Sequence, residues 1–289
     1  MARWARRLVE NAAGEFYVDD TCIDCATCRV VAPASFGATT RGLSYVHAQP
    51  EDAAERRRAL MALVACPTAS IGTVGCAPAH EGVAAFPEPL QDGVFYCGFA
   101  SEATFGASSY LIAREGGNVM VDVPRPAAPL VRRIAAMGGL DRLVLSHRDD
   151  VAGHGRWRDR FGCARVMHAA DATGDLRAVE QRIEGDDPVA LAPDLLAIPV
   201  PGHTKGSLAL LYRETFLFTG DHLMGTEDGR GLHASRGVCW YSWTEQVRSL
   251  RRLLDYRFEW VLPGHGGRYR APSAAAMRAE LERLIAAVA

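Results

Sequence analysis

The sequence predicts an α/β protein with a small N-terminal domain in front of one large domain. Four apolar runs in the second part of the chain each lead directly into a histidine or an aspartate, and α/β proteins place their chemistry at such strand ends. Helical patterns alternate with these runs, and the closely spaced cysteines occur near the N-terminus. With 289 residues, of which 48% are hydrophobic, the chain can bury a large core and a smaller second one.

The composition argues against several kinds of partner. The formal net charge is −2, basic and acidic residues are interspersed, and no track of basic and aromatic residues stands out, so we expect no nucleic-acid partner. Residues 1–7 are charged but lack the apolar segment of a signal peptide, and no run approaches the ~18 apolar residues of a membrane span. The sequence therefore predicts a cytoplasmic protein with no membrane partner.

The cysteines predict an iron–sulfur cluster. Cys22-x2-Cys25-x2-Cys28 resembles the cysteine run of bacterial ferredoxins, in which a further x3-Cys-Pro serves a second cluster. Ala32-Pro33 occupies that position here, while Cys66 is again followed by proline. Residues 1–75 therefore resemble a one-cluster ferredoxin domain, and we expect a [4Fe–4S] cluster on these four cysteines. The alternatives are disulfides, which need an oxidising compartment, and a structural zinc, which usually binds two separated cysteine pairs.

The remaining cysteines have no ligand spacing and are predicted to be small buried apolar residues: Cys76, Cys97, Cys163 and Cys239.

A linker is predicted between the two domains. Residues 76–91 are rich in Ala, Pro and Gly and show no amphipathic period, so the large domain is expected to span 92–289. It opens with strand patterns over 94–96, 109–112 and 118–122.

Helices are expected after these strands. The patterns cover residues 126–137, 151–161 and 274–288. A fourth helix begins at Ser242, where Ser242 and Glu245 form a capping-box pattern ahead of apolar residues at helical spacing.

Four motifs follow the apolar runs and carry the expected chemistry. They are His147-x-Asp149, Pro-Gly-His203-Thr-x-Gly-Ser, Thr-Gly-Asp221-His and Pro-Gly-His265-Gly. Together they resemble the successive metal-binding motifs of the metallo-β-lactamase-fold superfamily, from about residue 94 to the end of the sequence. The resemblance implies an αββα sandwich that binds metal at one edge of its two sheets and acts on a small-molecule substrate. It implies His147, Asp149, His203, Asp221 and His265 as metal ligands.

The first motif departs from the pattern of the family, H-x-H-x-D-H. Asp149 stands at the second histidine position, and Val151 and Ala152 replace the last two ligands. Asp150 and His154 lie four residues apart, on one face of the predicted helix, so they either replace the lost ligands or form a supporting pair. The alternative for Asp149 is an acid in the first turn of that helix.

Other polar residues near the motifs receive different interpretations. We interpret Asp149, Asp150 and Asp221 as catalytic carboxylates. Asp122, at the end of an earlier strand, is interpreted as a supporting acid, and His222 is expected to point away from the site.

Three functions remain open. A carboxylate in place of an imidazole favours iron or manganese over zinc, and it resembles the flavodiiron branch of the superfamily. The first hypothesis is therefore an oxidoreductase with one or two divalent metals, preferably iron, that receives electrons from the cluster and from a reductase. The second is a metallohydrolase of an ester, thioester or lactam-like bond, similar to the glyoxalase II branch, in which the metal activates water. The third is a redox sensor or binding protein with a degenerate site.

Residues 225–243 contain three aromatic residues in a glycine-rich stretch, Trp240, Tyr241 and Trp243. They are interpreted either as a lid over the metal or as a packing surface between the two domains.

Overall fold

Residues 1–75 and 79–289 are described by the structure, which is a computed structural model. The chain divides into an N-terminal unit, residues 1–113 with 124–139, and a C-terminal unit, residues 114–123 with 140–289. Cys76 and the start of the predicted linker lie outside the described residues. The described remainder of that linker contains α3 (Ala79–Ala84) and β5 (Glu88–Gln91).

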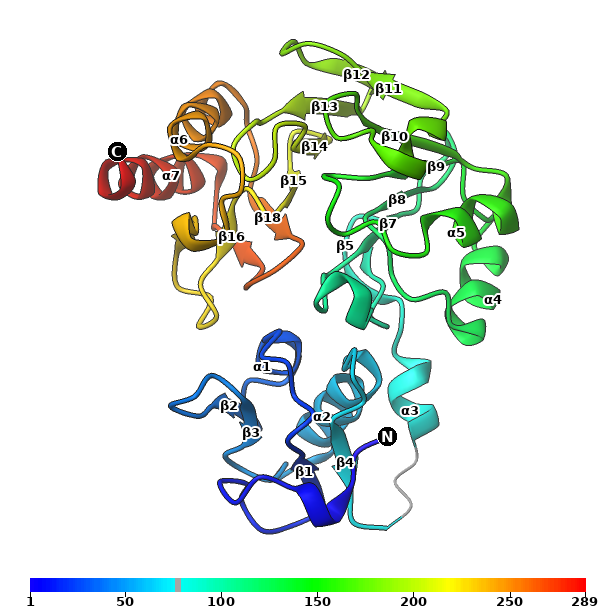
Figure 1. The fold of residues 1–289 in the computed structure, drawn as a ribbon, viewed down its shortest axis with the longest axis vertical. Coiled ribbons are helices and arrows are strands. Elements are labelled where there is room, and N and C mark those ends of the chain that lie inside the picture. The colour runs from blue at the N-terminus through cyan, green and yellow to red at the C-terminus, as the bar shows by residue number, and fades with distance from the viewer. Residues whose placement is uncertain (76–78) are drawn as a thin grey trace. The chain divides into compact units, whose positions relative to one another are not determined.

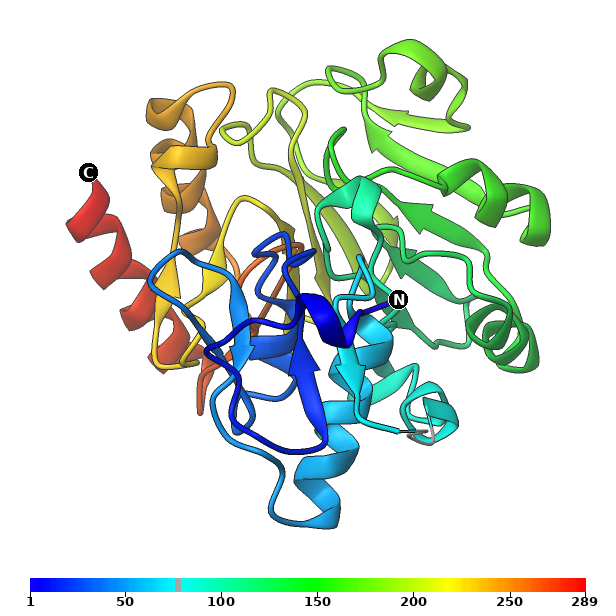
Figure 2. The same cartoon turned by 60° about the horizontal axis from the view of Figure 1, so that its bottom comes forward.

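The first part of the N-terminal unit is built on two small antiparallel strand pairs (Figure 1). β1 (Phe16–Val18) pairs with β4 (Ile71–Thr73), with Val18 opposite Ile71. This register brings the segment after β1, which contains Cys22, to the same end of the pair as the segment before β4, which contains Cys66. The other elements here are β2 (Phe36–Ala38), β3 (Ser44–Val46), η1 (Trp4–Arg6), α1 (Thr27–Val31) and α2 (Ala53–Ala65). Figure 2 shows these elements from a second direction.

The rest of this unit contains three antiparallel strands. β6 (Val94–Tyr96) pairs with β5 on one side and with β7 (Tyr110–Ile112) on the other. The buried Phe86 ring packs edge-on against Tyr96 and Phe99, with ring centroids 5.8 and 5.7 Å apart. The unit also includes η2 (Glu102–Thr104) and α4 (Ala128–Ala136).

The C-terminal unit begins with a run of parallel strands. Its members are β8 (Val119–Val121), β9 (Arg142–Val144), β10 (Ala164–His168) and β11 (Gln181–Ile183). α5 (His154–Phe161) connects β9 to β10, between Gly153 and Gly162, which both have left-handed φ values of 89° and 68°. Because the strands are parallel, their carboxyl ends meet at one edge.

A second, six-stranded sheet follows. Its order is β12-β13-β14-β15-β18-β19, and β15 pairs in parallel with β18. The segments after β15 and β18 therefore leave the sheet side by side. The bounds of these strands are β12 (Val189–Ala192), β13 (Leu195–Pro199), β14 (Leu208–Tyr212), β15 (Phe216–Gly220), β18 (Trp260–Pro263) and β19 (Tyr269–Arg270).

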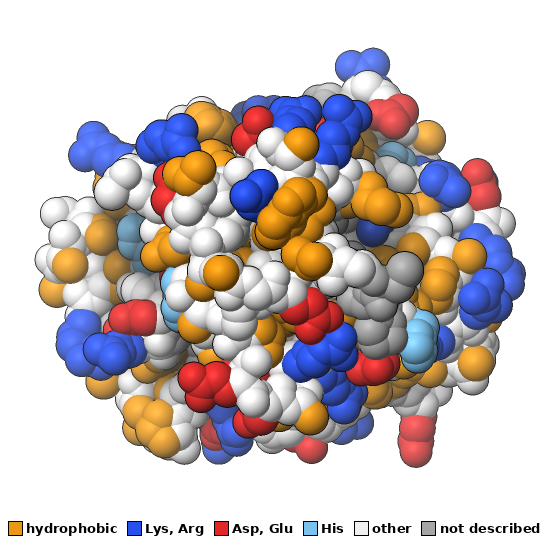
Figure 3. All heavy atoms as spheres, turned by 90° about the horizontal axis from the view of Figure 1, so that it is seen from below, with side chains coloured by type: hydrophobic (Ala, Val, Ile, Leu, Met, Phe, Trp, Pro, Cys, Tyr) orange, Lys and Arg blue, Asp and Glu red, His pale blue; other side chains and the backbone are white. Residues whose placement is uncertain are grey.

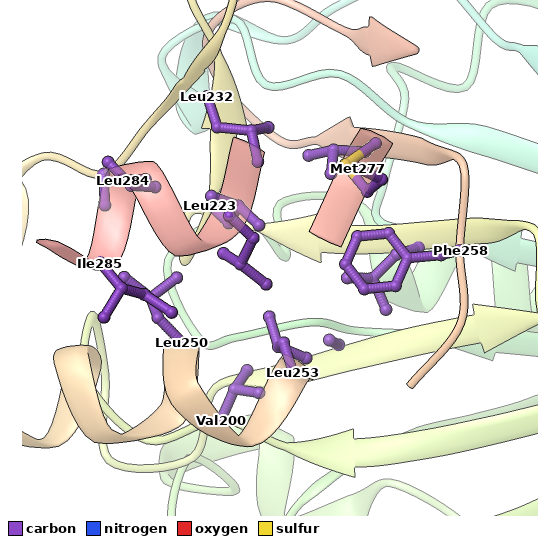
Figure 4. Packing of buried hydrophobic residues seen from close by; sticks show 14 of the residues in the cluster. Val200, Leu223, Leu232, Leu250, Leu253, Phe258, Met277, Leu284 and Ile285 are labelled. Atoms are coloured by element: carbon purple, nitrogen blue, oxygen red, sulfur yellow. The ribbon is translucent and has the colours of Figure 1, made fainter. Parts of the chain in front are cut away.

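Two helices cover one face of this sheet. α6 (Trp243–Arg252) and α7 (Ala274–Val288) bury Leu250, Met277 and Ile285 in a cluster that also holds Val200 and Val261 from the sheet region (Figure 4). The remaining short elements are β16 (Met224–Gly225), β17 (Leu232–His233), η3 (Gly174–Ala178), η4 (Arg236–Val238) and η5 (Leu253–Asp255).

Most sequence-based element predictions are confirmed. The predicted strand at 94–96 matches β6, and the helix predicted over 274–288 matches α7. The capping box is present, because the Ser242 hydroxyl accepts a hydrogen bond from the Glu245 amide at 3.3 Å. Among the described residues, every helix is too short or not apolar enough to cross a bilayer. On the face in Figure 3, basic and acidic side chains are interspersed.

Candidate metal and cluster sites

Four strand ends of the C-terminal unit deliver the predicted metal ligands. His147 follows β9, His203 follows β13, Asp221 follows β15, and His265 follows β18. The Leu208 amide at the start of β14 donates to the Ser146 carbonyl at 2.7 Å, so the parallel run and the second sheet meet at this point. The structure therefore brings together side chains that are far apart in the sequence.

The first group of candidate ligands is His147, Asp149 and His203, whose donor atoms all lie within 4.8 Å of one another. His203 Nε2 lies 3.3 Å from Asp149 Oδ2. The two imidazole rings meet edge to face, with centroids 4.7 Å apart. Two imidazoles and one carboxylate thus converge on one position.

The second group is His147, Asp150 and Asp221, which meets the same 4.8 Å criterion. His147 Nε2 lies 3.6 Å from Asp150 Oδ2. His265 Nδ1 lies 2.9 Å from both carboxylate oxygens of Asp221 and 3.6 Å from Asp150 Oδ2. Asp221 Oδ2 is also 3.8 Å from His203 Nε2 and 3.9 Å from His147 Nε2, so it lies between the two groups.

The donor atoms fit a bound cation. His147 Nε2, His203 Nε2 and Asp150 Oδ2 are buried and have no hydrogen-bond partner in the described part of the chain. Leaving such an atom unsatisfied costs about 1–3 kcal/mol, and metal ions bound at the two groups would satisfy all three. Burial and the neighbouring Asp221 raise the pKa of Asp150 well above its ordinary value. A cation between the two carboxylates would offset their mutual repulsion and stabilise the ionised form of Asp150.

Two glycines keep this region open. A Cβ at Gly264 would lie 2.8 Å from Asp221 Oδ1 and 3.3 Å from Asp150 Oδ2. Gly220 has a left-handed φ of 50°, and a Cβ there would collide with the Ser146 hydroxyl. The glycines of the Gly-Asp221 and Gly-His265 motifs are therefore required by space and backbone conformation.

Asp122 supports His147 through Ser146. Its carboxylate accepts hydrogen bonds from the Ser146 amide at 2.8 Å and from the Ser146 hydroxyl at 2.9 Å. The same hydroxyl lies 2.9 Å from His147 Nδ1, which directs Nε2 toward the candidate ligands. Burial raises the pKa of Asp122 to about 7. The contacts agree with the supporting role predicted for this acid.

Asp171 is a second supporting acid, and sequence reasoning missed it. It accepts hydrogen bonds from the Thr204 hydroxyl at 2.6 Å, the Gly206 amide at 2.9 Å and the Arg148 amide at 3.0 Å. It thereby ties the loop that carries His203 to the loop that carries Asp149. The available signal was its position just after β10, a fifth strand followed by an acid.

The structure does not bring His154 into either ligand group. Its Nδ1 lies 3.0 Å from Arg165 Nη1 and its Nε2 lies 3.6 Å from Asp175 Oδ2. The prediction assumed that Asp150 and His154 share one helix, but α5 begins only at His154. A ligand role for His154 therefore has no geometric support in the described residues.

His222 also lies outside both groups. It is fully buried, and burial together with His203 lowers its pKa to about 3.

The four predicted cluster ligands line one cavity in the N-terminal unit. Cys22, Cys25, Cys28 and Cys66 surround it together with Ser44 and Ser70, among other residues. The Ser44 amide donates to Cys22 Sγ at 3.4 Å, and the Ser70 amide donates to Cys66 Sγ at 3.3 Å. Burial raises the pKa of Cys28 to about 12, so a thiolate here requires a positive partner, which iron would supply. Four convergent thiols fit a [4Fe–4S] cluster.

A glycine from outside the cysteine motifs packs against this cavity. Gly106 has a φ of 86°, and a Cβ there would lie 2.9 Å from Cys25 Sγ. The Thr27 hydroxyl donates to the Gly106 carbonyl at 3.1 Å. The contact was not predicted, because no sequence pattern links residues 27 and 106.

The other described cysteines are not part of this cavity. Cys97 and Cys163 are buried as predicted, whereas Cys239 is only partly buried and donates to the Gly202 carbonyl at 3.1 Å.

Comparison with known proteins supports the N-terminal domain and the fold of the rest of the chain. Residues 18–73 match the sequence model of the 4Fe-4S single cluster domain of Ferredoxin I. The structure resembles the DIM-1 metallo-β-lactamase with a TM-score of 0.50 and 16% identity, over 68% of this chain and 96% of that one. It resembles ETHE1 from Myxococcus xanthus with a TM-score of 0.50 and 23% identity, over 67% and 84% of the two chains. The protein has a metallo-β-lactamase fold with a single-cluster ferredoxin domain at its N-terminus, as predicted.

Among curated proteins, the chain is similar to hydroxyacylglutathione hydrolases. The protein from Fuscovulum blasticum is 34% identical over 134 residues, which cover 45% of this chain and 52% of the relative. A protein of the same description from Cereibacter sphaeroides is 33% identical over 135 residues, with the same coverage. The match spans about half the length of these relatives.

Proposed function

We propose that the protein is a metal-dependent hydrolase of a thioester or ester bond. The observation that carries this proposal is the pair of adjoining ligand groups that share His147, with Asp221 between them. The similarity to enzymes described as hydroxyacylglutathione hydrolases supports the same reaction class. In such a hydrolysis the carbonyl carbon gains a bond to water oxygen and loses its bond to sulfur, and the products are a thiol and a carboxylic acid.

Six side chains would hold one or two divalent ions. His147, Asp149 and His203 would form one site, and Asp150, Asp221 and His265 would complete the other. Ions bound there supply Lewis acidity and activate water. Three imidazoles and three carboxylates suit zinc, iron and manganese.

The three aspartates would have different tasks. The Asp149 side chain is 42% accessible, whereas that of Asp150 is 4% accessible. Asp149 is therefore the carboxylate that an approaching substrate meets, and it could accept a proton from water or return one to the leaving thiol. Asp150 and Asp221 would bind metal from the buried side of the site and fix its position.

A redox reaction at iron is the second candidate. Asp149 stands where the family has a histidine, and the chain carries a cluster domain that could supply electrons. This candidate requires an electron-donating reductase as partner and iron in the site.

We also propose a division into a cluster domain of residues 1–75, a linker of 76–91 and a hydrolase domain of 92–289. None of the described cysteines is in a disulfide, and we propose a cytoplasmic, reducing location.

Hydrolysis of a simple thioester by metal-loaded protein tests the proposal. Wild type should cleave acetyl-N-acetylcysteamine, and Asp221→Ala should lower kcat/KM by at least about 100-fold because the carboxylate that lies between the two ligand groups is lost. Asp228→Ala, which changes an aspartate exposed in the loop between β16 and β17, should leave the rate unchanged. Metal-loaded wild type that fails to cleave any thioester or ester, but reduces an electron acceptor, would favour the redox candidate.

A further inference from the structure

Exposed apolar side chains gather beside the metal ligands. In the described part of the C-terminal unit, the exposed large hydrophobic residues all lie within residues 238–241. The exposed fractions are 38% for Val238, 61% for Trp240 and 48% for Tyr241. We call this stretch the aromatic segment. A local cluster of exposed aromatic side chains is typical of a surface that binds a ligand or a partner.

The aromatic segment is fixed to the backbone of a ligand. The amides of Trp240 and Tyr241 donate to the His203 carbonyl at 2.9 and 3.0 Å. The next amide, that of Ser242, donates to the Gly202 carbonyl at 3.0 Å, and the Cys239 thiol donates to the same carbonyl at 3.1 Å. Consecutive contacts of this kind hold the backbone that carries the two rings at a constant position relative to His203, so little backbone ordering is needed when a ligand binds.

The Trp240 indole lies at the rim of the site. Its ring centroid is 6.2 Å from that of the His203 imidazole, with 57° between the planes. His203 Nε2 faces Asp149, the exposed carboxylate of the first ligand group. A substrate whose carbonyl reached these ligands would therefore place the adjoining part of its acyl group against the indole.

Packing within the C-terminal unit accounts for one of the three aromatic residues of this region. Trp243, the third aromatic residue of the region, is partly buried against the core of the second sheet. Trp240 and Tyr241 are more exposed, so about half of the surface of each side chain is not covered by packing within the unit. Both rings remain free to be covered by a ligand.

We propose that Trp240 forms the acyl-binding wall of the site and selects thioesters or esters with an apolar, preferably aromatic, acyl group. This inference rests on the proposed hydrolase function and adds the substrate class. Discrimination would come from burial of the substrate's apolar acyl group against the indole, which a short acetyl group cannot provide.

A pair of substrates that differ only in the acyl group tests the inference. Metal-loaded full-length protein is assayed with phenylacetyl- and acetyl-N-acetylcysteamine. Trp240→Ala should lower kcat/KM for the phenylacetyl substrate by about 10- to 100-fold and for the acetyl substrate by less than about threefold. Trp240→Phe should retain most of the preference, since a ring is kept. Trp4→Ala changes an exposed tryptophan in the N-terminal unit and should alter neither rate.

A binding measurement separates the inference from the proposed function. The ketone analogue of the phenylacetyl substrate, with a methylene in place of the sulfur, is titrated into wild type and Trp240→Ala by calorimetry. Weaker binding to the variant, by about 10-fold or more, supports the wall even if wild type hydrolyses neither thioester. Equal binding of the analogue by both proteins, or an equal loss of activity on both substrates, overturns the inference while leaving the hydrolase proposal standing.

Discussion

Two adjacent aspartates in the metal region have opposite electrostatic environments. The close approach of His203, whose Nε2 lies 3.3 Å from Asp149 Oδ2, lowers the pKa of Asp149, whereas burial and the charge of Asp221 raise the pKa of Asp150. Asp149 is exposed and Asp150 is buried. Neighbouring residues therefore present one carboxylate to solvent and one to the interior, and they should respond differently to substitution.

Asp149→His should shift the metal content toward zinc. The change gives His147 and His203 a third imidazole neighbour, and zinc prefers a nitrogen-rich tetrahedral site more than iron does. We expect the zinc-to-iron ratio outside the cluster to rise by at least about threefold. The ratio is measured by elemental analysis of both proteins grown in the same medium, with Asp228→His as control. An unchanged ratio would mean that Asp149 does not bind metal; helix capping cannot explain such a result, because α5 begins at His154 with Gly153 as its cap.

Asp150→Asn should have opposite effects on the metal-free and metal-loaded proteins. Without metal, the substitution removes a buried ionisable group beside Asp221 and should raise the free energy of unfolding by about 1 kcal/mol. With metal, it removes a ligand and should lower the stabilisation that metal provides. Thermal unfolding with chelator and with added metal measures both changes. If the variant is less stable than wild type in chelator, then Asp150 has a stabilising partner in the metal-free protein, which would contradict this account.

At the scale of elements, the position of α5 decides which first-motif residues reach the metal region. The helical pattern predicted a start near residue 151, but Gly153 adopts a left-handed φ of 89° and delays the helix to His154. Asp149 and Asp150 are consequently loop residues, and Asp150 does not share a helical face with His154. The sequence pattern could not reveal this, because a single left-handed residue changes the direction of the chain without changing its apolar period.

The edge strand β5 was also not predicted. It contains Pro89, which cannot donate to a neighbouring strand, and it lies in a stretch rich in Ala, Pro and Gly. Its pairing with β6 is a tertiary property that local composition does not reveal. The strands that carry His203, Asp221 and His265 were predictable, because each is apolar and ends at a glycine-containing motif.

The contact between β10 and the segment before β11 should be sensitive to acid. Hydrogen bonds from Arg165 lower the pKa of Glu180 to about 2, from an ordinary value of 4.5. Because the folded-state pKa is the lower one, the stability contributed by this carboxylate is complete above about pH 4.5 and is lost as the pH falls toward 2. Glu180→Gln should therefore be less stable than wild type at neutral pH, and the difference should shrink in acid. Urea unfolding at several pH values measures the difference; a constant difference from pH 7 to pH 3 would contradict the assignment.

At the scale of the whole molecule, the chain carries two centres that draw on separate parts of the sequence. The cysteine cavity is built within residues 18–71, and the metal ligands lie within residues 147–265. Both sets of ligand positions were predictable because each depends on short motifs. Asp171 and Gly106 were not, since each supports its centre through contacts between distant segments.

Loss of a cluster ligand should affect the N-terminal unit first. Wild type should be brown, with broad visible absorption, and Cys25→Ala or Cys66→Ala should remove the colour. Because binding of the cluster and folding of so small a core are coupled, both variants should also be less soluble. Cys97→Ala, which changes a buried cysteine outside the cavity, should keep the colour. A colourless wild type that contains zinc instead of iron would contradict the cluster assignment.

Metal stoichiometry of wild type and Asp221→Ala tests the central claim most directly. Elemental analysis combined with a sulfide assay distinguishes the four irons of the cluster from metal bound elsewhere. Wild type should contain one or two further divalent ions per chain. Asp221→Ala should lose them and keep the cluster, because Asp221 lies between both ligand groups and contacts His265. Full retention of the additional metal by Asp221→Ala would contradict the assignment of the metal site to these residues.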